Sequence, residues 1–217
     1  MNPRRYRLVL LAAGALILPW LCPPLATAHE TDQPPVIVAF GDSLTAGLGV
    51  PLEQSYPARL QQKLREAGFP HRVVNAGASG DTTAGGLRRV DAVLAHGPSI
   101  VILELGANDG LRGIGLPHIR NNLDQIIRRL QAAGAAVVLA GMKLPPNYGP
   151  VYTGQFAAMY AELAKARGIA LIPFFLDGVA ARAELNQPDG IHPTADGYRV
   201  IVERLWPVLK PLLKKAG

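Results

Sequence analysis

Cysteine is nearly absent from this sequence: of its 217 residues, only Cys22 carries a thiol. One cysteine cannot form a disulfide framework or a zinc–thiolate site. Cys22 also lies in a segment that we expect to be removed, as argued below, so the mature protein would have no thiol at all. This excludes a cysteine nucleophile and suits an oxidising compartment.

Strong charge of either sign is lacking as well. The chain has 22 Lys and Arg residues against 16 Asp and Glu residues, which gives a formal charge of +6. Three of the basic residues and none of the acidic ones precede residue 29, so removal of that segment lowers the charge to +3. No basic stripe with interleaved aromatic residues is present either. We therefore expect no nucleic-acid partner.

The apolar stretch near the N-terminus is short for a membrane-spanning helix, which needs about 20 apolar residues. This stretch, Leu8–Leu21, follows three arginines, contains Pro19, and precedes Ala26-Thr27-Ala28. A basic start, a short apolar core and a small-x-small end predict a signal peptide over residues 1–28, cleaved after Ala28. We expect a periplasmic or secreted protein without stable membrane insertion. An uncleaved N-terminal anchor is the alternative.

Common nucleotide motifs are missing too. The first predicted strand is followed by neither a Walker A lysine nor Gly-x-Gly-x-x-Gly, which weakens any case for nucleotide or hydride chemistry. The Gly-x-Ser-x-Gly elbow of α/β-hydrolases is also absent, although a serine in another kind of turn can perform the same chemistry.

What the chain does contain is an alternation of short apolar runs with amphipathic segments. The runs are predicted to be buried parallel strands over residues 36–40, 72–75, 100–104, 136–140 and 169–172. Strands that alternate with helices imply right-handed βαβ crossovers, and hence an α/β fold with a three-layer α/β/α sandwich. No linker or repeat divides the chain after residue 29, so we expect one domain over residues 29–217.

The segments between the strands are predicted to be helices. They cover about 55–66, from Thr82 to about 96–98, from Pro117 to Gly134, and about 153–167, with a short helical stretch around 176–184. A last helix begins at Thr194. Pro207 and Pro211 should kink or break it near Trp206.

Polar residues gather directly after the predicted strands. Ser43 follows the first strand within Gly41-Asp42-Ser43-Leu44-Thr45, where a lone serine would usually be a helix cap or turn residue. Near the other end of the chain, however, Asp189 and His192 supply a carboxylate and an imidazole three positions apart. Because the carboxyl ends of parallel strands form the usual ligand site, we expect these groups to meet.

This set of residues fits acyl transfer. Ser43 would attack a carbonyl, His192 would take and return the proton, and Asp189 would hold the imidazole. The backbone N–H groups of Ser43 and Gly80 and the carboxamide of Asn108 would stabilise the oxyanion. Taken alone, Asn108 fits an αL or Asx turn, and Gly80 fits a helix-entry turn; only the combination favours catalysis.

The remaining acids and histidines near these turns have simpler interpretations. We interpret three aspartates as turn and cap residues and three histidines as surface residues: Asp42, Asp81, Asp109, His71, His96 and His118.

Four sequence blocks resemble those of the SGNH (GDSL) hydrolases: Gly41-Asp42-Ser43-Leu44, Ser79-Gly80-Asp81-Thr82, Gly106-Ala107-Asn108-Asp109 and Asp189-Gly190-Ile191-His192. The stretches 104–106, 108–113 and 144–149 look most like the bacterial periplasmic thioesterase I/protease I/lysophospholipase enzymes, also called arylesterases. The resemblance implies a flavodoxin-like sheet of order 2-1-3-4-5 and no cofactor or metal. It also implies hydrolysis of aryl esters, acyl-CoA and lysophospholipids with medium to long acyl chains, through an acyl-enzyme.

The loop after the fourth predicted strand is our candidate for binding the acyl chain. Met142, Leu144, Pro145 and Tyr148 would form an apolar wall on a backbone restricted by two prolines. The alternatives are that the loop only covers the edge of the core, or that the groove lies along Leu48–Leu52. We expect a monomer whose only partner is a small acyl ester or thioester.

Two other functions remain open from the sequence. A non-catalytic acyl carrier would keep a pocket without turnover, but it has no need of Ser43, Asp189 and His192 together. A carbohydrate O-deacetylase would use the same chemistry on a sugar ester. The apolar loop at 142–148 favours an acyl chain over a sugar.

Overall fold

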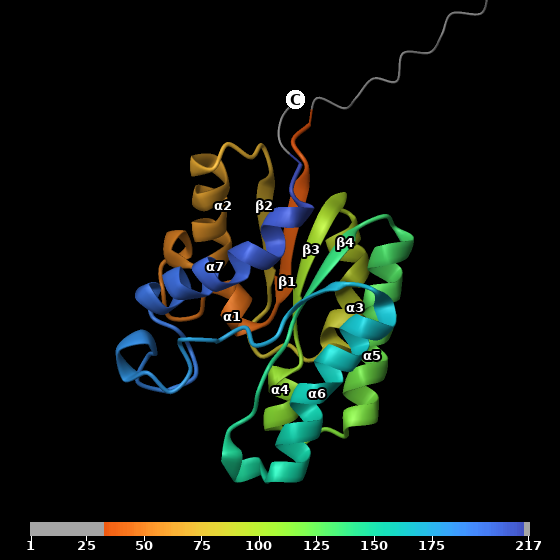
Figure 1. The fold of residues 1–217 in the computed structure, drawn as a ribbon, viewed down its shortest axis with the longest axis vertical. Helices are drawn as coiled ribbons and strands as arrows, with labels where there is room; N and C mark the ends of the chain where they lie inside the picture. Colours follow the sequence, from red (N-terminus) through yellow and green to blue (C-terminus); the bar gives the residue numbers. More distant parts are fainter. Residues whose placement is uncertain (1–32, 215–217) are drawn as a thin grey trace, which may run out of the picture. The chain divides into compact units, whose positions relative to one another are not determined.

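Five parallel strands form the centre of the computed structural model, which describes residues 33–214 (Figure 1). The predicted signal peptide, residues 1–28, lies outside the described residues. The strands are β1 (Val36–Gly41), β2 (Arg72–Gly77), β3 (Pro98–Glu104), β4 (Ala136–Ala140) and β5 (Ala170–Ile172). They pair in the order β2-β1-β3-β4-β5, with every pair parallel. The predicted fold class and strand order are confirmed.

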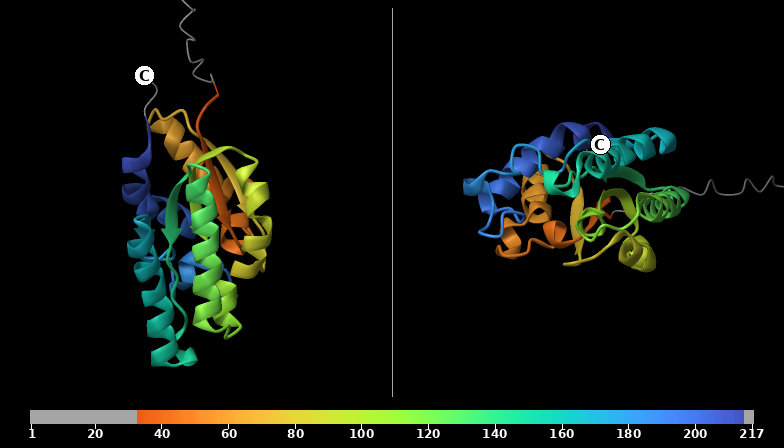
Figure 2. Two further views of the ribbon diagram at one scale, coloured as in Figure 1. Left: turned by 90° about the vertical axis from the view of Figure 1, so that its right-hand side faces the viewer. Right: turned by 90° about the horizontal axis from the view of Figure 1, so that it is seen from below.

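Helices cover both faces of this sheet. They are α1 (Ser43–Ala46), α2 (Tyr56–Glu66), α3 (Thr83–Leu94), α4 (Ala107–Leu111), α5 (Leu116–Ala132), α6 (Pro150–Arg167) and α7 (Ala195–Leu209). Helices α2 and α7 contact each other on one face, and α3 and α5 pack together on the other (Figures 1 and 2). Helix α6 lies beside α5 near the β5 edge. Short 3₁₀ turns cover Leu52–Gln54 (η1), Pro146–Tyr148 (η2), Ala183–Leu185 (η3) and Lys210–Leu212 (η4).

The apolar patterns explain which elements are buried. Every residue of the central strand β1 is buried, whereas the edge strand β2 is half exposed along its length. In α5 the apolar positions repeat at helical spacing, and all are fully buried: Ile119, Leu123, Ile126, Ile127 and Leu130. Within the described part of the chain, no helix combines the length and the apolar character needed to cross a bilayer.

The register of the sheet brings three strand ends level with one another. Gly41, the last residue of β1, pairs with Gly77 at the end of β2 and with Glu104 at the end of β3. The segments that follow these strands contain Ser43, Gly80 and Asn108. They therefore start from one edge of the sheet, as predicted for a parallel fold.

The C-terminal helix differs from its prediction. Helix α7 continues through Pro207 to Leu209, and the chain changes to a 3₁₀ turn only at Lys210, next to Pro211. The predicted break near Trp206 is wrong, because packing outweighs the hydrogen bond that proline cannot make. Leu205 and Leu209 are fully buried, and Trp206 packs edge-on against Phe69 with 6.0 Å between ring centroids.

Other local predictions also need correction. In place of the helical stretch predicted around 176–184, the chain forms turns up to residue 181 and only the short 3₁₀ helix η3 after them, and α6 begins at Pro150 instead of near residue 153. The turns at Ser43 and Asn108 contain short helices, α1 and α4. His71 is buried rather than on the surface; it packs edge-on against Phe69, and burial lowers the pKa of its imidazole.

The buried face of α5 yields a prediction about stability. Leu130→Ala should lower the free energy of unfolding by about 2–5 kcal/mol, because it removes fully buried methyl groups and leaves a cavity. Arg128→Ala, on the exposed side of the same helix, should change it by less than about 0.5 kcal/mol. Denaturant titration of both variants measures the difference. Equal losses would contradict the packing of α5 described above.

Candidate active site

Ser43, His192 and Asp189 lie in a continuous line of hydrogen bonds. The Oγ of Ser43 is 2.8 Å from Nε2 of His192, and Nδ1 of the same ring is 2.7 Å from Oδ2 of Asp189. The serine and the histidine are 149 positions apart in the sequence. The structure thus brings together all three residues that the sequence singled out as a nucleophile, a base and its partner.

The carboxylate of Asp189 is fixed from its own loop. Its Oδ1 accepts hydrogen bonds of 3.0 Å from the backbone N–H groups of Ile191 and His192. The pKa of Asp189 is lowered to about 2 by hydrogen bonds from the N–H groups of His192 and Ile191 and from the imidazole of His192. This carboxylate therefore stays ionised down to strongly acidic pH, although it is largely exposed.

A second set of bonds holds the histidine loop against the turn after α1. The side-chain amide of Gln187 donates to the carbonyls of Leu48, at 2.7 Å, and Pro193, at 3.0 Å. The backbone N–H of Gln187 donates to the carbonyl of His192 at 2.7 Å. These contacts place the imidazole from the far end of the chain beside the serine. Nothing in the local sequence pattern indicated this role for Gln187.

Ser43 is presented at the first position of α1, where the residue is only 8% exposed. Asp42 caps this helix, since its Oδ1 accepts the N–H of Leu44 at 3.0 Å. The prediction that Asp42 is a cap residue is therefore confirmed, but its other oxygen accepts a bond from Asn108 at 2.9 Å.

The predicted oxyanion donors lie around the serine. Gly80 has a φ of 78°, which an L side chain rarely adopts, and its carbonyl accepts a bond of 3.1 Å from Arg112. Asn108 follows Gly106, where a side chain would collide with the hydroxyl of Tyr160. The chain can therefore bend into α4 at this point only with glycine.

The amide of Asn108 is already engaged in this structure. Its Nδ2 donates to Oδ2 of Asp42 and to the carbonyl of Asp81, both at 2.9 Å. An amide nitrogen has two hydrogens, so both are in use. Donation to an oxyanion requires Asn108 to release one of these two bonds.

Two residues to which the sequence assigned no role in the site connect its elements. Asp109 is 2% exposed, and its carboxylate accepts bonds from the backbone N–H and the hydroxyl of Thr83, which tie α4 to the start of α3. Asp109 was interpreted as a turn residue, and only its tertiary partner distinguishes it from one.

Arg89 is the second connecting residue. Its guanidinium donates to Asp81 at 2.6 Å and to the carbonyls of Ala76 and Gly41 at 2.7 Å each. It also lies 4.5 Å from the ring centroid of Phe40. One side chain therefore joins the ends of β1 and β2 to the segment that carries Gly80. A lone arginine on a predicted helix gave no signal of this.

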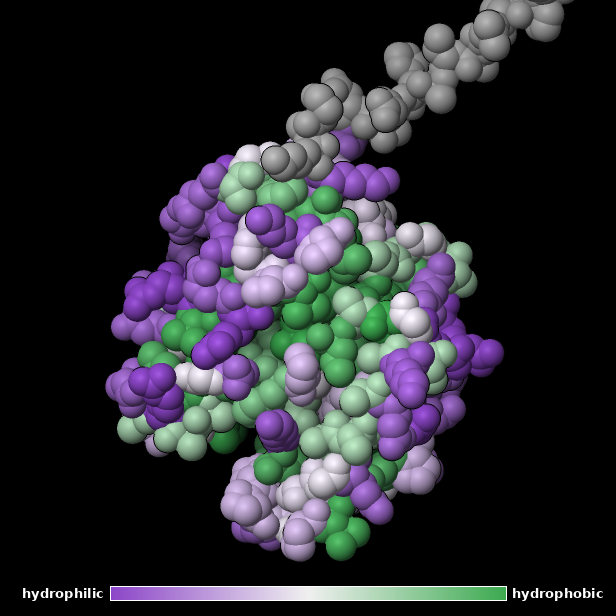
Figure 3. All heavy atoms as spheres, in the orientation of Figure 1, coloured by the Kyte–Doolittle hydropathy of each residue, from purple (hydrophilic) through white to green (hydrophobic). Residues whose placement is uncertain are grey.

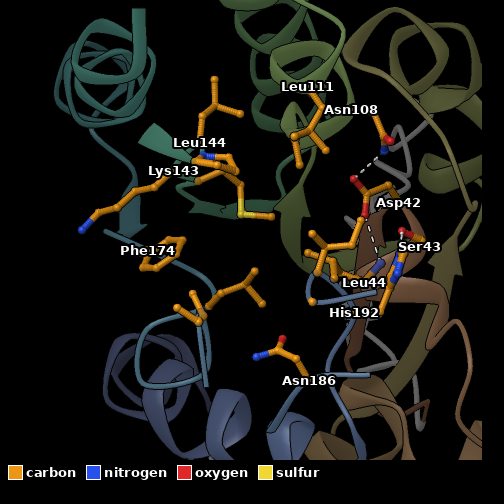
Figure 4. A pocket seen from close by; sticks show the side chains of 18 of the residues that line it. Asp42, Ser43, Leu44, Asn108, Leu111, Lys143, Leu144, Phe174, Asn186 and His192 are labelled. Carbon is orange, nitrogen blue, oxygen red and sulfur yellow. Dashed lines mark hydrogen bonds between the residues drawn. The ribbon is translucent and has the colours of Figure 1, made fainter. Parts of the chain in front are cut away.

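A cavity of about 640 Å³ opens beside the serine. Asp42, Ser43, Asn108 and His192 lie at one end of it, and Leu111, Leu144 and Phe174 are among its apolar lining residues (Figure 4). The apolar lining also includes Leu48, Met142 and Pro145. The surface is hollowed between the lobe around residues 180–192 and the lobe of α4 and η2, with apolar residues around the hollow (Figure 3).

Three of the four predicted substrate-binding residues, Met142, Leu144 and Pro145, line this cavity. Tyr148 does not; its hydroxyl donates to the carbonyl of Leu111 at 2.9 Å and so holds the loop against α4. Among residues 33–214, no group of three or more His, Cys, Asp or Glu side chains is placed to hold a metal ion.

The contacts of Arg89 predict a selective loss of turnover. Arg89→Lys should lower kcat roughly 10- to 100-fold with little change in KM, because lysine cannot replace a planar fork that orients three segments. Arg88→Lys, at the exposed neighbouring position, is the matched control and should behave as the wild type. Steady-state kinetics on a p-nitrophenyl ester measures both. An unchanged kcat in Arg89→Lys would remove Arg89 from the support of the site.

Comparison with known proteins gives a consistent picture. The family described as "GDSL-like Lipase/Acylhydrolase family" matches residues 39–200. The chain is 43% identical to "Esterase TesA" of Pseudomonas aeruginosa, with 94% of this chain and 98% of the relative covered. It is 38% identical to "Thioesterase 1/protease 1/lysophospholipase L1" of Escherichia coli, with 90% and 93% covered.

Solved structures agree with these relatives. A crystal structure of TesA superimposes with a TM-score of 0.80 at 45% identity, covering 82% of this chain and 99% of that one. The SGNH-hydrolase esterase AlinE4 gives a TM-score of 0.70 at 43% identity, covering 84% and 98%.

Proposed function

The chain belongs to the GDSL-like lipase/acylhydrolase family and is an enzyme that hydrolyses ester and thioester bonds, and from this premise we propose that Ser43, His192 and Asp189 are its catalytic triad. The observation that carries the proposal is the line of hydrogen bonds, 2.8 Å and 2.7 Å long, from Ser43 through His192 to Asp189. A serine becomes a nucleophile when a base can take its proton and a third group holds that base.

The geometry defines how the proton moves. Asp189, held ionised, accepts the Nδ1–H of His192 and so leaves Nε2 free to take the proton of Ser43. The serine oxygen then adds to the substrate carbonyl. His192 returns the proton to the leaving group, which departs and leaves an acyl-enzyme. Water activated by the same imidazole hydrolyses this ester and restores the serine.

The oxyanion formed in each step needs donors that are already in place. We propose the backbone N–H groups of Ser43 and Gly80 and the amide of Asn108 for this role. Asn108 would exchange its bond to the carbonyl of Asp81 for one to the oxyanion and keep its bond to the Asp42 carboxylate. The bond that is kept holds the amide in position during the exchange.

The cavity supports a substrate with an apolar acyl chain. Met142, Leu144 and Pro145 line it beyond the serine, and each buried methylene contributes about 0.8 kcal/mol. We propose that the physiological substrates are carboxylic esters and acyl thioesters such as lysophospholipids or acyl-CoA. A sugar O-deacetylase would have less use for this apolar wall.

We further propose that the enzyme acts in the periplasm or outside the cell as a single domain spanning residues 29–217. The arginines, the short apolar core and the Ala26-Thr27-Ala28 site of the N-terminal segment support export.

Loss of the nucleophile should abolish nearly all turnover. Ser43→Ala is expected to lower kcat by roughly 10⁴-fold or more, and adding His192→Ala should cost little further, because the triad acts as a unit. Hydrolysis of p-nitrophenyl esters and circular dichroism report activity and fold. Ser99→Ala, near the opposite end of β3, is the control and should retain full activity. If the two single losses multiplied in the double variant, the shared role would be wrong.

Acyl-chain selectivity tests the wall of the cavity. Leu144→Ala should lower kcat/KM for octanoyl esters several-fold and leave acetyl esters almost unchanged, because only the longer chain reaches this side chain. Val151→Ala, at an exposed position that does not line the cavity, is the control. A uniform loss would mean that the scaffold was disturbed. No change at any length would place the acyl chain along Leu48–Leu52 instead.

A further inference from the structure

Two carboxyl groups are buried directly behind the nucleophile. Asp42 is 1% exposed and Glu104 is 0% exposed. Glu104 ends β3 and pairs in register with Gly41, the residue before Asp42. The reaction described above gives neither group a proton to transfer, so their burial requires another explanation.

The hydrogen bonds are shared unequally between these two groups. Both oxygens of Asp42 accept a bond, from the N–H of Leu44 at 3.0 Å and from the amide of Asn108 at 2.9 Å. Only one oxygen of Glu104 does so: Oε2 accepts the hydroxyl of Thr45 at 2.8 Å and, at 3.3 Å, the N–H of Asp42. The other oxygen, Oε1, is buried with no hydrogen-bond partner. An ionised carboxylate is far more costly in such a place than a protonated one, because it also carries an uncompensated charge.

The surrounding charges also favour a protonated Glu104. The titratable groups that act on Glu104 or feel its charge are Asp42 and the tyrosines of three helices, Tyr56, Tyr160 and Tyr198, and none of these is a cation. Two neighbouring carboxyl groups cannot both ionise cheaply, and the charge of His192 lowers the pKa of Asp42, which favours ionisation of Asp42. Burial raises the pKa of both groups. The charge of Asp42 also raises the pKa of Glu104.

We propose that Glu104 is a positioning residue that works as a neutral carboxylic acid, while Asp42 carries the single negative charge of the pair. Neutral Glu104 holds the first turn of α1 through Thr45 and the N–H of Asp42. The Asp42 carboxylate holds the amide of Asn108. The consequence for catalysis rests on the proposed function: the oxyanion then forms near one negative charge instead of two.

Infrared spectroscopy of the whole enzyme tests where the proton is. With ¹³C-labelled glutamate carboxyl groups, the spectrum at neutral pH should contain a carbonyl band of a protonated acid that shifts with the label. This band should disappear in Glu104→Gln and persist in Glu53→Gln, a control at an exposed position. Absence of any protonated-acid band would overturn the proposal. So would a band that shifts only with labelled aspartate and disappears in Asp42→Asn.

Kinetics test the positioning role separately. Glu104→Ala should lower kcat roughly 10- to 100-fold with little change in KM, since Thr45 and the N–H of Asp42 lose their acceptor. Glu104→Gln should recover most of that loss, because a neutral carboxamide offers the same acceptor and a hydrogen in place of the acid proton. A glutamine variant as impaired as the alanine variant would contradict the neutral acid.

Melting temperatures identify a variant that simply fails to fold, and the infrared result does not depend on such a variant being active. It is also independent of whether Ser43 is the nucleophile, so failure of this inference and failure of the proposed triad remain distinguishable.

Discussion

The level ends of β1, β2 and β3 are the constraint on which the rest of this site depends. Gly41 pairs with both Gly77 and Glu104, so the segments that carry Ser43, Gly80 and Asn108 leave the sheet at the same height. Strand β1 is buried along its whole length, and a shift of one residue would turn its side chains toward the wrong helix layer. The apolar core therefore fixes the position of polar groups that contribute little to it.

Bonds between elements then hold the polar segments at that edge. Arg89 ties the ends of β1 and β2 to Asp81, and Asp109 ties α4 to the start of α3. Gln187 joins the histidine loop to Leu48. Each contact spans residues that are distant in the chain, so the geometry around Ser43 exists only when the whole domain is folded. Groups held before the substrate arrives need no reorganisation during the reaction.

Ser43 separates two environments of opposite character. On one side lies the open cavity, with an apolar wall suited to an acyl chain and with the imidazole of His192. On the other side lies the buried pair of carboxyl groups, Glu104 and Asp42, of which Asp42 also borders the cavity. Asn108 connects the two, because its amide lines the cavity and bonds to the Asp42 carboxylate. The negative charge that we propose for Asp42 would therefore bear on the oxyanion that forms in the cavity.

The sequence alone determined the fold class, the five strands and the residues of the proposed triad. Apolar runs of four or five residues and helical periodicity between them are local signals, and α5 shows the helical periodicity clearly. Ser43, Asp189 and His192 were identifiable because a nucleophilic serine needs a base and an acid. The sequence has all three residues in loops that follow predicted strands. The strand order came from the resemblance to a known family, not from periodicity.

The tertiary structure decided what depends on partners distant in the chain. Pro207 should end a helix by local rules, yet α7 continues through it because Leu205 and Leu209 are buried on either side. His71 is polar and was expected on the surface, but the core encloses it beside Phe69. The roles of Arg89, Asp109 and Glu104 had no local signal at all. Each depends on bonds to residues that the fold alone brings within reach, and a hydrogen bond acts only over about 3 Å.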